Sequence, residues 1–195
     1  MTLGEIAGLL AVVFGILGSW GLWKQNRLIW GGKSAKSVSG TWVITFLAMF
    51  TAFLIYGTKQ SSVPMMFQGW LRVAFSLPVS IGFVKYGRVE REHIALGCIY
   101  LLGLATMVSG ILAPTLFVVF STLGILASFV QAWTIRKNRS RGAVAVELQM
   151  IYLAAVVAWL VYGFVRKDIP LMLVSTGFIG SYSSTVIMWF RYPQK

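Results

Sequence analysis

The stretch LAMFTAFLIYGTKQSSVP, residues 47–64, decides the fold because it returns 106 residues later as LAAVVAWLVYGFVRKDIP, residues 153–170. Each copy is an apolar run that ends in Tyr-Gly and is followed by a short polar segment and a proline. The same offset, without a gap, also maps Gln25 onto Gln131. A constant offset across three apolar runs and two loops indicates an internal repeat rather than chance hydrophobicity.

The composition places these repeats in a membrane. Hydrophobic residues make up 57% of the 195 positions and charged residues 11%, against roughly a quarter charged in a soluble domain. So few charges cannot cover a water-exposed surface, which excludes a soluble globular protein. Apolar runs close to the roughly 20 residues that cross a bilayer as a helix occur at 3–23, 40–58, 65–84, 94–112, 115–134, 145–165 and 170–190. We therefore predict an all-α polytopic membrane protein with seven transmembrane helices.

The basic residues predict the orientation of these helices. The net charge of +12 comes from 17 Lys and Arg against 5 Asp and Glu, and the cations cluster between apolar runs rather than forming a nucleic-acid surface. With the N-terminus outside and the C-terminus cytoplasmic, 13 cations lie inside and 3 outside, as the positive-inside rule requires. The inner set is Lys24, Arg27, Lys33, Lys36, Lys85, Arg88, Arg91, Arg136, Lys137, Arg139, Arg141, Arg191 and Lys195, and the outer set is Lys59, Arg166 and Lys167. We expect the lipid bilayer, and not nucleic acid, to be the partner, and the pattern leaves open which membrane it is.

The repeat and the number of spans together predict the architecture. Three spans are an odd number, so two repeats in direct succession would insert in opposite directions. We predict two parallel three-helix bundles, residues 1–92 and 114–195, joined by a linker transmembrane helix over 93–113. Transporters built from such repeats bind their substrate near the midplane, where the halves meet.

The repeat unit resembles the SWEET, SemiSWEET and PQ-loop transporter superfamily. The resemblance lies in the basic loop at residues 33–39, the Tyr56-Gly57 pair and Pro64, and it covers nearly the whole chain apart from the linker helix. It implies a transporter that works by alternating access between the two bundles, without a cofactor.

The chain departs from this family at the Pro-Gln pair that precedes the basic loop. Lys24-Gln25 and Val130-Gln131 stand at those places, so both glutamines match and both prolines are missing. In the family the proline lets the first helix bend during gating. Because this chain lacks that proline, the resemblance does not assign a hinge to its first helix. Gln25 and Gln131 are candidates for a hydrogen-bonded lock across the repeat interface or for gating. Pro78, inside the third span, removes a backbone hydrogen bond and should bend that helix.

The resemblance also implies positions for a substrate pocket. In the small sugar-transporting relatives a Trp three residues before the Tyr-Gly pair and an Asn five residues beyond the loop proline contact the sugar. These positions are Phe53 and Gly69 in the first repeat and Trp159 and Ser175 in the second, so only Trp159 matches by identity. An aromatic face offers stacking area, whereas Asn offers directed hydrogen bonds. Core packing is the alternative for Trp159, and helix packing for Gly69 and Ser175.

Arg72 is the one cation inside a predicted span. Eight residues at 1.5 Å each place it about 12 Å from Pro64, and its spacing from Gly69 puts both residues on one helical face. A charge at this depth should face the protein interior or a watery cavity. We hypothesise that Arg72 binds an anionic group of the substrate. The alternatives are that it caps backbone carbonyls near Pro78 or extends outward to the membrane surface.

These observations predict a facilitative transporter of a small polar solute, with a sugar as the first expectation. One alternative is a carrier of an organic anion or amino acid bound through Arg72. Another is a membrane cargo receptor or binding protein on the same fold, because fold alone does not fix function. No catalytic constellation, cofactor motif or metal-ligand cluster is visible, so we do not expect an enzyme. Two repeats in one chain suffice for a monomeric pore, and a homo-oligomer is left open.

Overall fold

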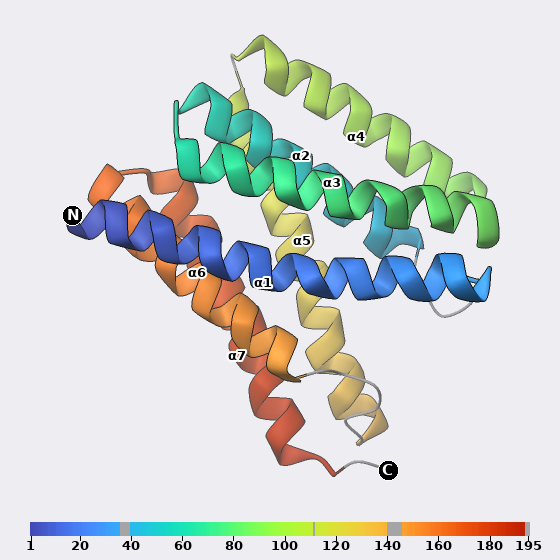
Figure 1. The fold of residues 1–195 in the computed structure, drawn as a ribbon. Coiled ribbons are helices and arrows are strands. Elements are labelled where there is room, and N and C mark those ends of the chain that lie inside the picture. Colours follow the sequence, from blue (N-terminus) through green and yellow to red (C-terminus); the bar gives the residue numbers. More distant parts are fainter. Residues whose placement is uncertain (36–39, 111, 140–145, 194–195) are drawn as a thin grey trace. The chain divides into compact units, whose positions relative to one another are not determined.

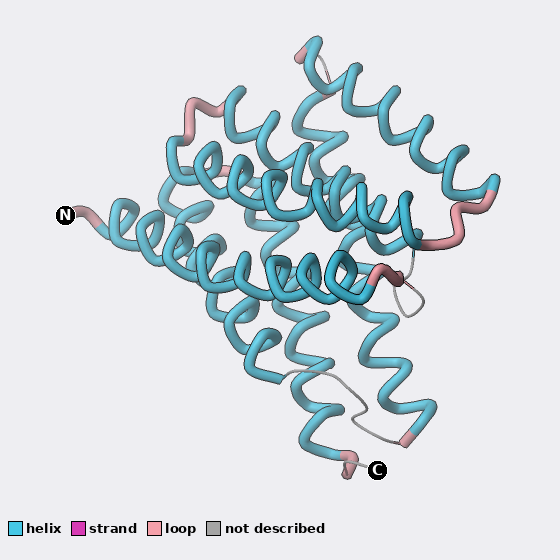
Figure 2. The backbone as a smooth tube through the Cα atoms, turned by 45° about the vertical axis from the view of Figure 1, so that its right-hand side comes forward, coloured by secondary structure: helices cyan, strands magenta, loops and turns pink. Residues whose placement is uncertain are grey.

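The computed structural model describes residues 1–35, 40–110, 112–139 and 146–193. In these ranges the chain consists of helices joined by short turns, and no strand occurs (Figure 2). The helices are α1 (Leu3–Gly32), α2 (Gly40–Lys59), α3 (Val63–Tyr86), α4 (Arg91–Ser109), α5 (Ala113–Asn138), α6 (Val146–Arg166) and α7 (Ile169–Arg191). All seven are long and apolar enough to cross a membrane. The predicted seven-helix all-α fold is therefore confirmed. Residues 36–39 of the predicted basic loop lie outside the described ranges.

Helix α1 continues nine residues beyond the apolar run that predicted it, to Gly32. The extension is stabilised by packing, because Ile29 is fully buried in a cluster with Val79 and Phe83 of α3. At 1.5 Å per residue the 30-residue helix is about 45 Å long, against about 30 Å for the hydrocarbon core of a bilayer. Its last turns therefore reach the polar boundary of the membrane.

Helix α4 starts three residues before the start of the predicted span 94–112 and ends three residues before its end. Local capping sets both ends. The Glu90 side chain accepts a hydrogen bond from the backbone of His93, and the His93 side chain accepts one from the backbone of Glu90. This capping box satisfies two backbone N–H groups at the start of the helix. At the other end Gly110 has φ of 94°, a left-handed conformation that terminates a helix and favours glycine.

The offset of 106 residues recurs in the backbone. The described non-glycine residues with positive φ are Lys33, Ser61, Arg139 and Lys167, which form two pairs at this offset. The turn after α2 is closed by a hydrogen bond from Ser62 N to Gly57 O, and the turn after α6 by one from Asp168 N to Gly163 O, each 2.9 Å long. The Tyr-Gly segments thus end their helices in the same way in both halves.

The helices form two compact units, each described by itself. The first unit is residues 15–120, and the second is residues 1–14 together with 121–195. In the first unit α2 packs against both α3 and α4, and in the second α6 packs against α7 (Figure 1). The boundaries of the units fall within α1 and α5. The domain limits expected from the sequence, 1–92, 93–113 and 114–195, stay a prediction.

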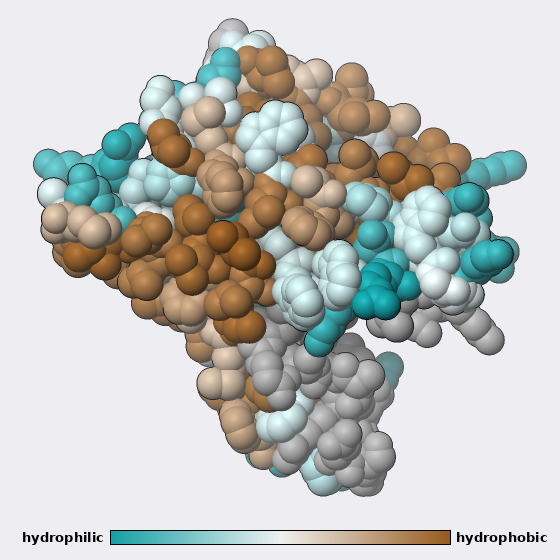
Figure 3. Space-filling model, viewed as in Figure 1, coloured by the Kyte–Doolittle hydropathy of each residue, from teal (hydrophilic) through white to brown (hydrophobic). Residues whose placement is uncertain are grey.

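The outer surface of α4 is suited to lipid. Its exposed side chains include Ile94, Ile99, Leu101, Leu102 and Val108. Figure 3 shows apolar residues covering much of this helix. A continuous apolar surface of this kind is unusual on a soluble monomer and is expected on a helix that faces acyl chains.

Candidate functional site

A polar face runs along α3 inside the first unit. Gln68, Arg72 and Ser76 follow one another at intervals of four residues, which aligns them on one side of the helix. All three are buried, and Arg72 is only 4% exposed. Arg72 is the tenth of the 24 residues of α3, so a cation lies near the middle of this membrane span. Its side chain is buried rather than extended to the surface.

Helices α1 and α2 complete the surroundings of this polar face. The Cζ atom of Arg72 lies 5.5 Å from the ring centroid of Phe50 on α2, within the range of a cation–π interaction. The Gln68 amide lies against the backbone of α1, because a Cβ atom added to Gly15 would be 2.7 Å from Gln68 Cδ. The polar face is therefore bounded by an aromatic ring on one side and by helix backbone on another.

Phe53, predicted to contact substrate, belongs to an aromatic cluster at the end of α2. Its half-buried ring lies 6.0 Å from the ring of Phe117 in the first turns of α5. Phe117 also stacks on Tyr56, with ring centroids 4.3 Å apart and an interplanar angle of 3°. Sequence reasoning missed both Phe50 and Phe117, because nothing in an apolar run distinguishes a phenylalanine that meets a functional residue from one that meets lipid.

Gly69 lies at a close approach between α3 and α2. A Cβ atom at this position would be 2.7 Å from both Cα and Cβ of Leu54. Real side chains do not tolerate such a distance to backbone, so any larger residue would separate the two helices. The geometry gives Gly69 a packing role, and a substrate contact at this position stays a prediction.

The other two predicted pocket residues lie in the second unit. Trp159 on α6 is 4% exposed and Ser175 on α7 is 2% exposed. The Trp159 ring meets the ring of Tyr162 edge to face at 5.5 Å. The structure thus brings Phe53, Gly69 and Arg72 into one unit and Trp159 and Ser175 into the other.

The positions of α7 that correspond to the polar face of α3 carry neither a charge nor an amide. The offset of 106 maps Gln68, Arg72 and Ser76 onto Val174, Phe178 and Tyr182, all of which are buried. Phe178 and Tyr182 stack with ring centroids 5.4 Å apart. The two halves repeat the same helix arrangement, but they differ chemically along this face.

Of the predicted gating residues, Pro78 has the most definite contact. Its carbonyl oxygen accepts a 3.0 Å hydrogen bond from the indole Nε1–H of Trp30 on α1. Gln25 is half-buried on α1, whereas the side chain of Gln131 lies outside the described part of the structure. A hydrogen bond between the two glutamines therefore stays a prediction. Within the described ranges, no three His, Cys, Asp or Glu side chains gather as metal ligands would.

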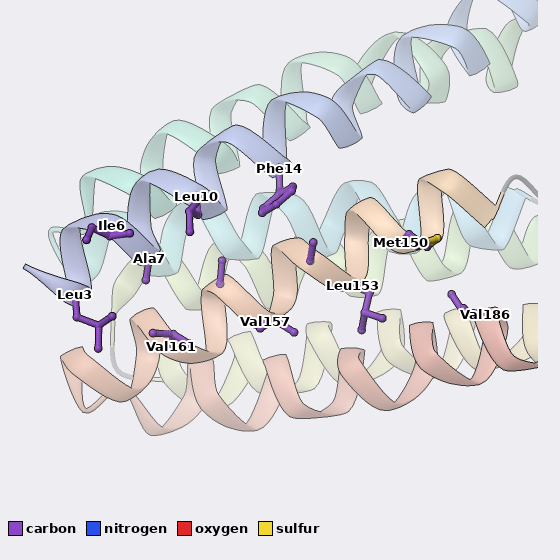
Figure 4. Close-up of a pocket in the computed structure, with 12 residues that line it drawn as sticks. Leu3, Ile6, Ala7, Leu10, Phe14, Met150, Leu153, Val157, Val161 and Val186 are labelled. Atoms are coloured by element: carbon purple, nitrogen blue, oxygen red, sulfur yellow. The ribbon is translucent and has the colours of Figure 1, made fainter.

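An apolar groove of about 600 Å³ lies in the second unit (Figure 4). It runs between the first part of α1, residues 3–14, and residues 150–161 of α6. It is lined by Leu3, Ile6, Ala7, Leu10, Phe14, Met150, Leu153, Ala154, Val157, Ala158, Val161 and Val186. None of the predicted site residues is among them. Because a polar solute needs a few directed hydrogen bonds, this groove fits an acyl chain rather than such a solute.

Comparison with known proteins identifies the fold. No protein-family model matches the chain, and no curated protein matches it in sequence. Among solved structures, that of a eukaryotic SWEET transporter at 3.7 Å resolution superimposes with a TM-score of 0.82. The match covers 97% of this chain and 96% of the other, at 13% sequence identity. The chain therefore has the fold of a SWEET transporter and is an integral multi-pass membrane protein.

Proposed function

We propose that this protein is a transporter that moves a small polar solute across a bilayer. The observation that carries the proposal is the SWEET-type fold, which extends over 97% of the chain. The seven helices that can cross a membrane support the same function. The proposed mechanism requires no nucleotide site.

The proposed mechanism is alternating access between the two three-helix bundles. In transporters with parallel repeats, substrate binds near the midplane between the halves. We assign Phe53 and Arg72 to the binding surface of one half and Trp159 and Ser175 to that of the other. All five acidic residues of the sequence lie within three residues of a helix start. A proton relay through mid-membrane carboxylates therefore has no support, and facilitated diffusion is the simpler mechanism.

A sugar is the first proposed substrate class. The support is the fold together with Trp159, whose indole offers the kind of flat apolar surface that stacks on a sugar ring. Ser175 adds one hydroxyl that can donate and accept a hydrogen bond. Gly69, packed against Leu54, supplies no side-chain donor in the first half.

An organic anion or amino acid is the second candidate, and Arg72 is the specific observation that favours it. A guanidinium remains charged at any physiological pH and binds a carboxylate or phosphate through two parallel hydrogen bonds. It is aligned on α3 with Gln68 and Ser76, whose amide and hydroxyl can hydrogen-bond a polar ligand.

Uptake into sealed proteoliposomes tests both candidates. Radiolabelled neutral sugars, amino acids and organic anions are compared in the native chain, in Arg72→Gln and in Arg88→Gln. Arg88→Gln is the matched control, because its side chain is 91% exposed at the end of α3. Sugar uptake that is equal in all three proteins supports the sugar. Anion uptake that is lost only in Arg72→Gln supports the anion. Binding without flux of any solute would contradict transport and favour a cargo receptor.

A further inference from the structure

Positive charge is concentrated at one end of the first unit, where α1 and α3 end and α4 begins. Among the described residues of this unit, the exposed cations at this end are Lys24, Arg27, Lys33, Lys85, Arg88 and Arg91, and the acids are Glu90 and Glu92. Lys59 is the described cation at the opposite end. Figure 3 shows hydrophilic residues gathered around the ends of α1 and α3. This end of the unit therefore attracts anions.

One aromatic ring at this end is held in a fixed orientation. The indole of Trp30 donates to the carbonyl oxygen of Pro78 at 3.0 Å. It also occupies a notch in α3, because a Cβ atom at Gly82 would lie 2.8 Å from Trp30 Nε1. The ring of Tyr86 meets the Trp30 ring edge to face at 5.6 Å. The two rings are thus fixed relative to each other before any ligand binds.

These rings frame the ammonium group of Lys85. Its Nζ atom lies 5.3 Å from the centroid of the Trp30 ring and 5.2 Å from that of Tyr86. The ion pair described at this end joins Arg88 to Glu90 instead, at 3.8 Å. A backbone hydrogen bond from Ala35 N to Tyr86 O ties the turn after α1 to the same place. Contacts with aromatic faces position the ammonium but leave its N–H donors available to an anion.

The face of α3 that continues from Lys85 toward the middle of the membrane is apolar. Leu77 and Ile81 precede Lys85 by eight and four residues, so the three side chains share one side of the helix. Leu77 is 46% and Ile81 50% exposed. A cation above an exposed apolar strip matches a phospholipid, whose phosphate lies at the membrane surface and whose acyl chains extend below it. A free phosphate ion would make no use of the strip.

We propose that Lys85, framed by Trp30 and Tyr86, binds the phosphate of an anionic phospholipid. Lysine is a compact point charge that binds phosphate well, and tryptophan and tyrosine prefer the headgroup level of a bilayer. The surrounding cations favour an anionic over a zwitterionic lipid. The site is separate from the proposed solute pathway and does not depend on the protein being a transporter.

The unfolding temperature of the purified full-length protein tests this site. It is measured in detergent while dioctanoyl-phosphatidylglycerol, dioctanoyl-phosphatidylcholine or inorganic phosphate is titrated in. We expect stabilisation by phosphatidylglycerol alone. In Lys85→Gln the half-saturating concentration should rise about fivefold, the effect of one basic residue at a membrane surface. Lys59→Gln, the same charge change at the opposite end of the unit, should leave it unchanged, and Lys85→Arg should retain it.

Three results would overturn the proposal. Equal stabilisation by phosphatidylcholine would show that the acyl chains alone are recognised. Equal stabilisation by inorganic phosphate would show that no lipid is needed. An equal response in Lys85→Gln and Lys59→Gln would show that the phosphate does not bind at Lys85. Each comparison uses the lipid-dependent shift within one variant, so a change in the baseline stability of that variant does not affect it.

Discussion

Replacing Gly69 by alanine tests how tightly α2 and α3 are packed at the candidate site. The added Cβ atom would lie 2.7 Å from Leu54 Cα and 3.0 Å from Leu54 N, and neither backbone atom can move without shifting α2. Gly15→Ala is the matched control. There the added Cβ atom would lie 2.7 Å from the end of the Gln68 side chain, which can rotate away.

The size of the effect follows from two opposing contributions. Overpacking a well-filled interior costs about 1–3 kcal/mol, while alanine stabilises a helix by about 1 kcal/mol relative to glycine. For Gly69→Ala the clash is with backbone, so we expect a cost in the upper part of that range, about 2–3 kcal/mol. After the helix gain of about 1 kcal/mol, the net loss is about 1–2 kcal/mol. In a chain of this length that lowers the unfolding temperature by about 2–8 °C. For Gly15→Ala the two contributions should nearly cancel.

Thermal unfolding in detergent, followed by tryptophan fluorescence, measures both variants and two double variants. Leu54→Ala should not rescue Gly69→Ala, because the obstructing atoms include the backbone of residue 54. Gln68→Ala should remove whatever destabilisation Gly15→Ala shows, because it removes the obstructing side chain. If Gly69→Ala is as stable as the native chain, or if Leu54→Ala restores it, the close approach inferred for α2 and α3 is wrong.

Three further outcomes are expected from hydrogen bonds within each unit. Trp30→Phe removes the indole donor to the Pro78 carbonyl and should lower the free energy of unfolding by about 0.5–1.5 kcal/mol. The measurement is the fall in unfolding temperature, and an unchanged temperature would show that this hydrogen bond contributes nothing to stability. Thr45→Val and Tyr100→Phe each break the 3.0 Å hydrogen bond between the hydroxyls of α2 and α4. The double variant should therefore be about as stable as the less stable of the two single variants. Additive losses of stability would contradict the pairing. Asp168→Ala removes the side-chain acceptor at the start of α7 and should cost about 1 kcal/mol, whereas Asp168→Asn should retain most of the stability.

The seven spans could be predicted because span length and hydropathy are local properties of the sequence. The helix ends were less accurate where other contacts set them. Hydropathy measures preference for lipid, so it missed the capping box of Glu90 and His93 and the left-handed Gly110, which together place α4 three residues earlier. It also ended α1 at its last apolar run, whereas burial of Ile29 against α3 carries the helix to Gly32.

The candidate site could be predicted only in part. Arg72 was evident because a charge inside an apolar run is rare, and the spacing of Gln68 and Ser76 is enough to place them on its face. Their neighbours were not evident, because Phe50 and Phe117 are distinguished from other phenylalanines only by the helix packing that brings them there. A resemblance carried over by position also misses steric context, as Gly69 shows by its contact with Leu54.

The difference between the two halves supports a functional role for the polar face of α3. Burying an arginine, an amide and a hydroxyl is unfavourable unless each is compensated by contacts, and packing alone does not require them. The second half places Val174, Phe178 and Tyr182 at the equivalent positions of α7, so the repeat can be built there without a charge or an amide. Both halves keep their turns in register at the offset of 106 residues. Folding therefore accounts for what the two halves share. Polar residues like those of α3 are not needed for folding in the equivalent half, so a functional requirement is the explanation to test for them.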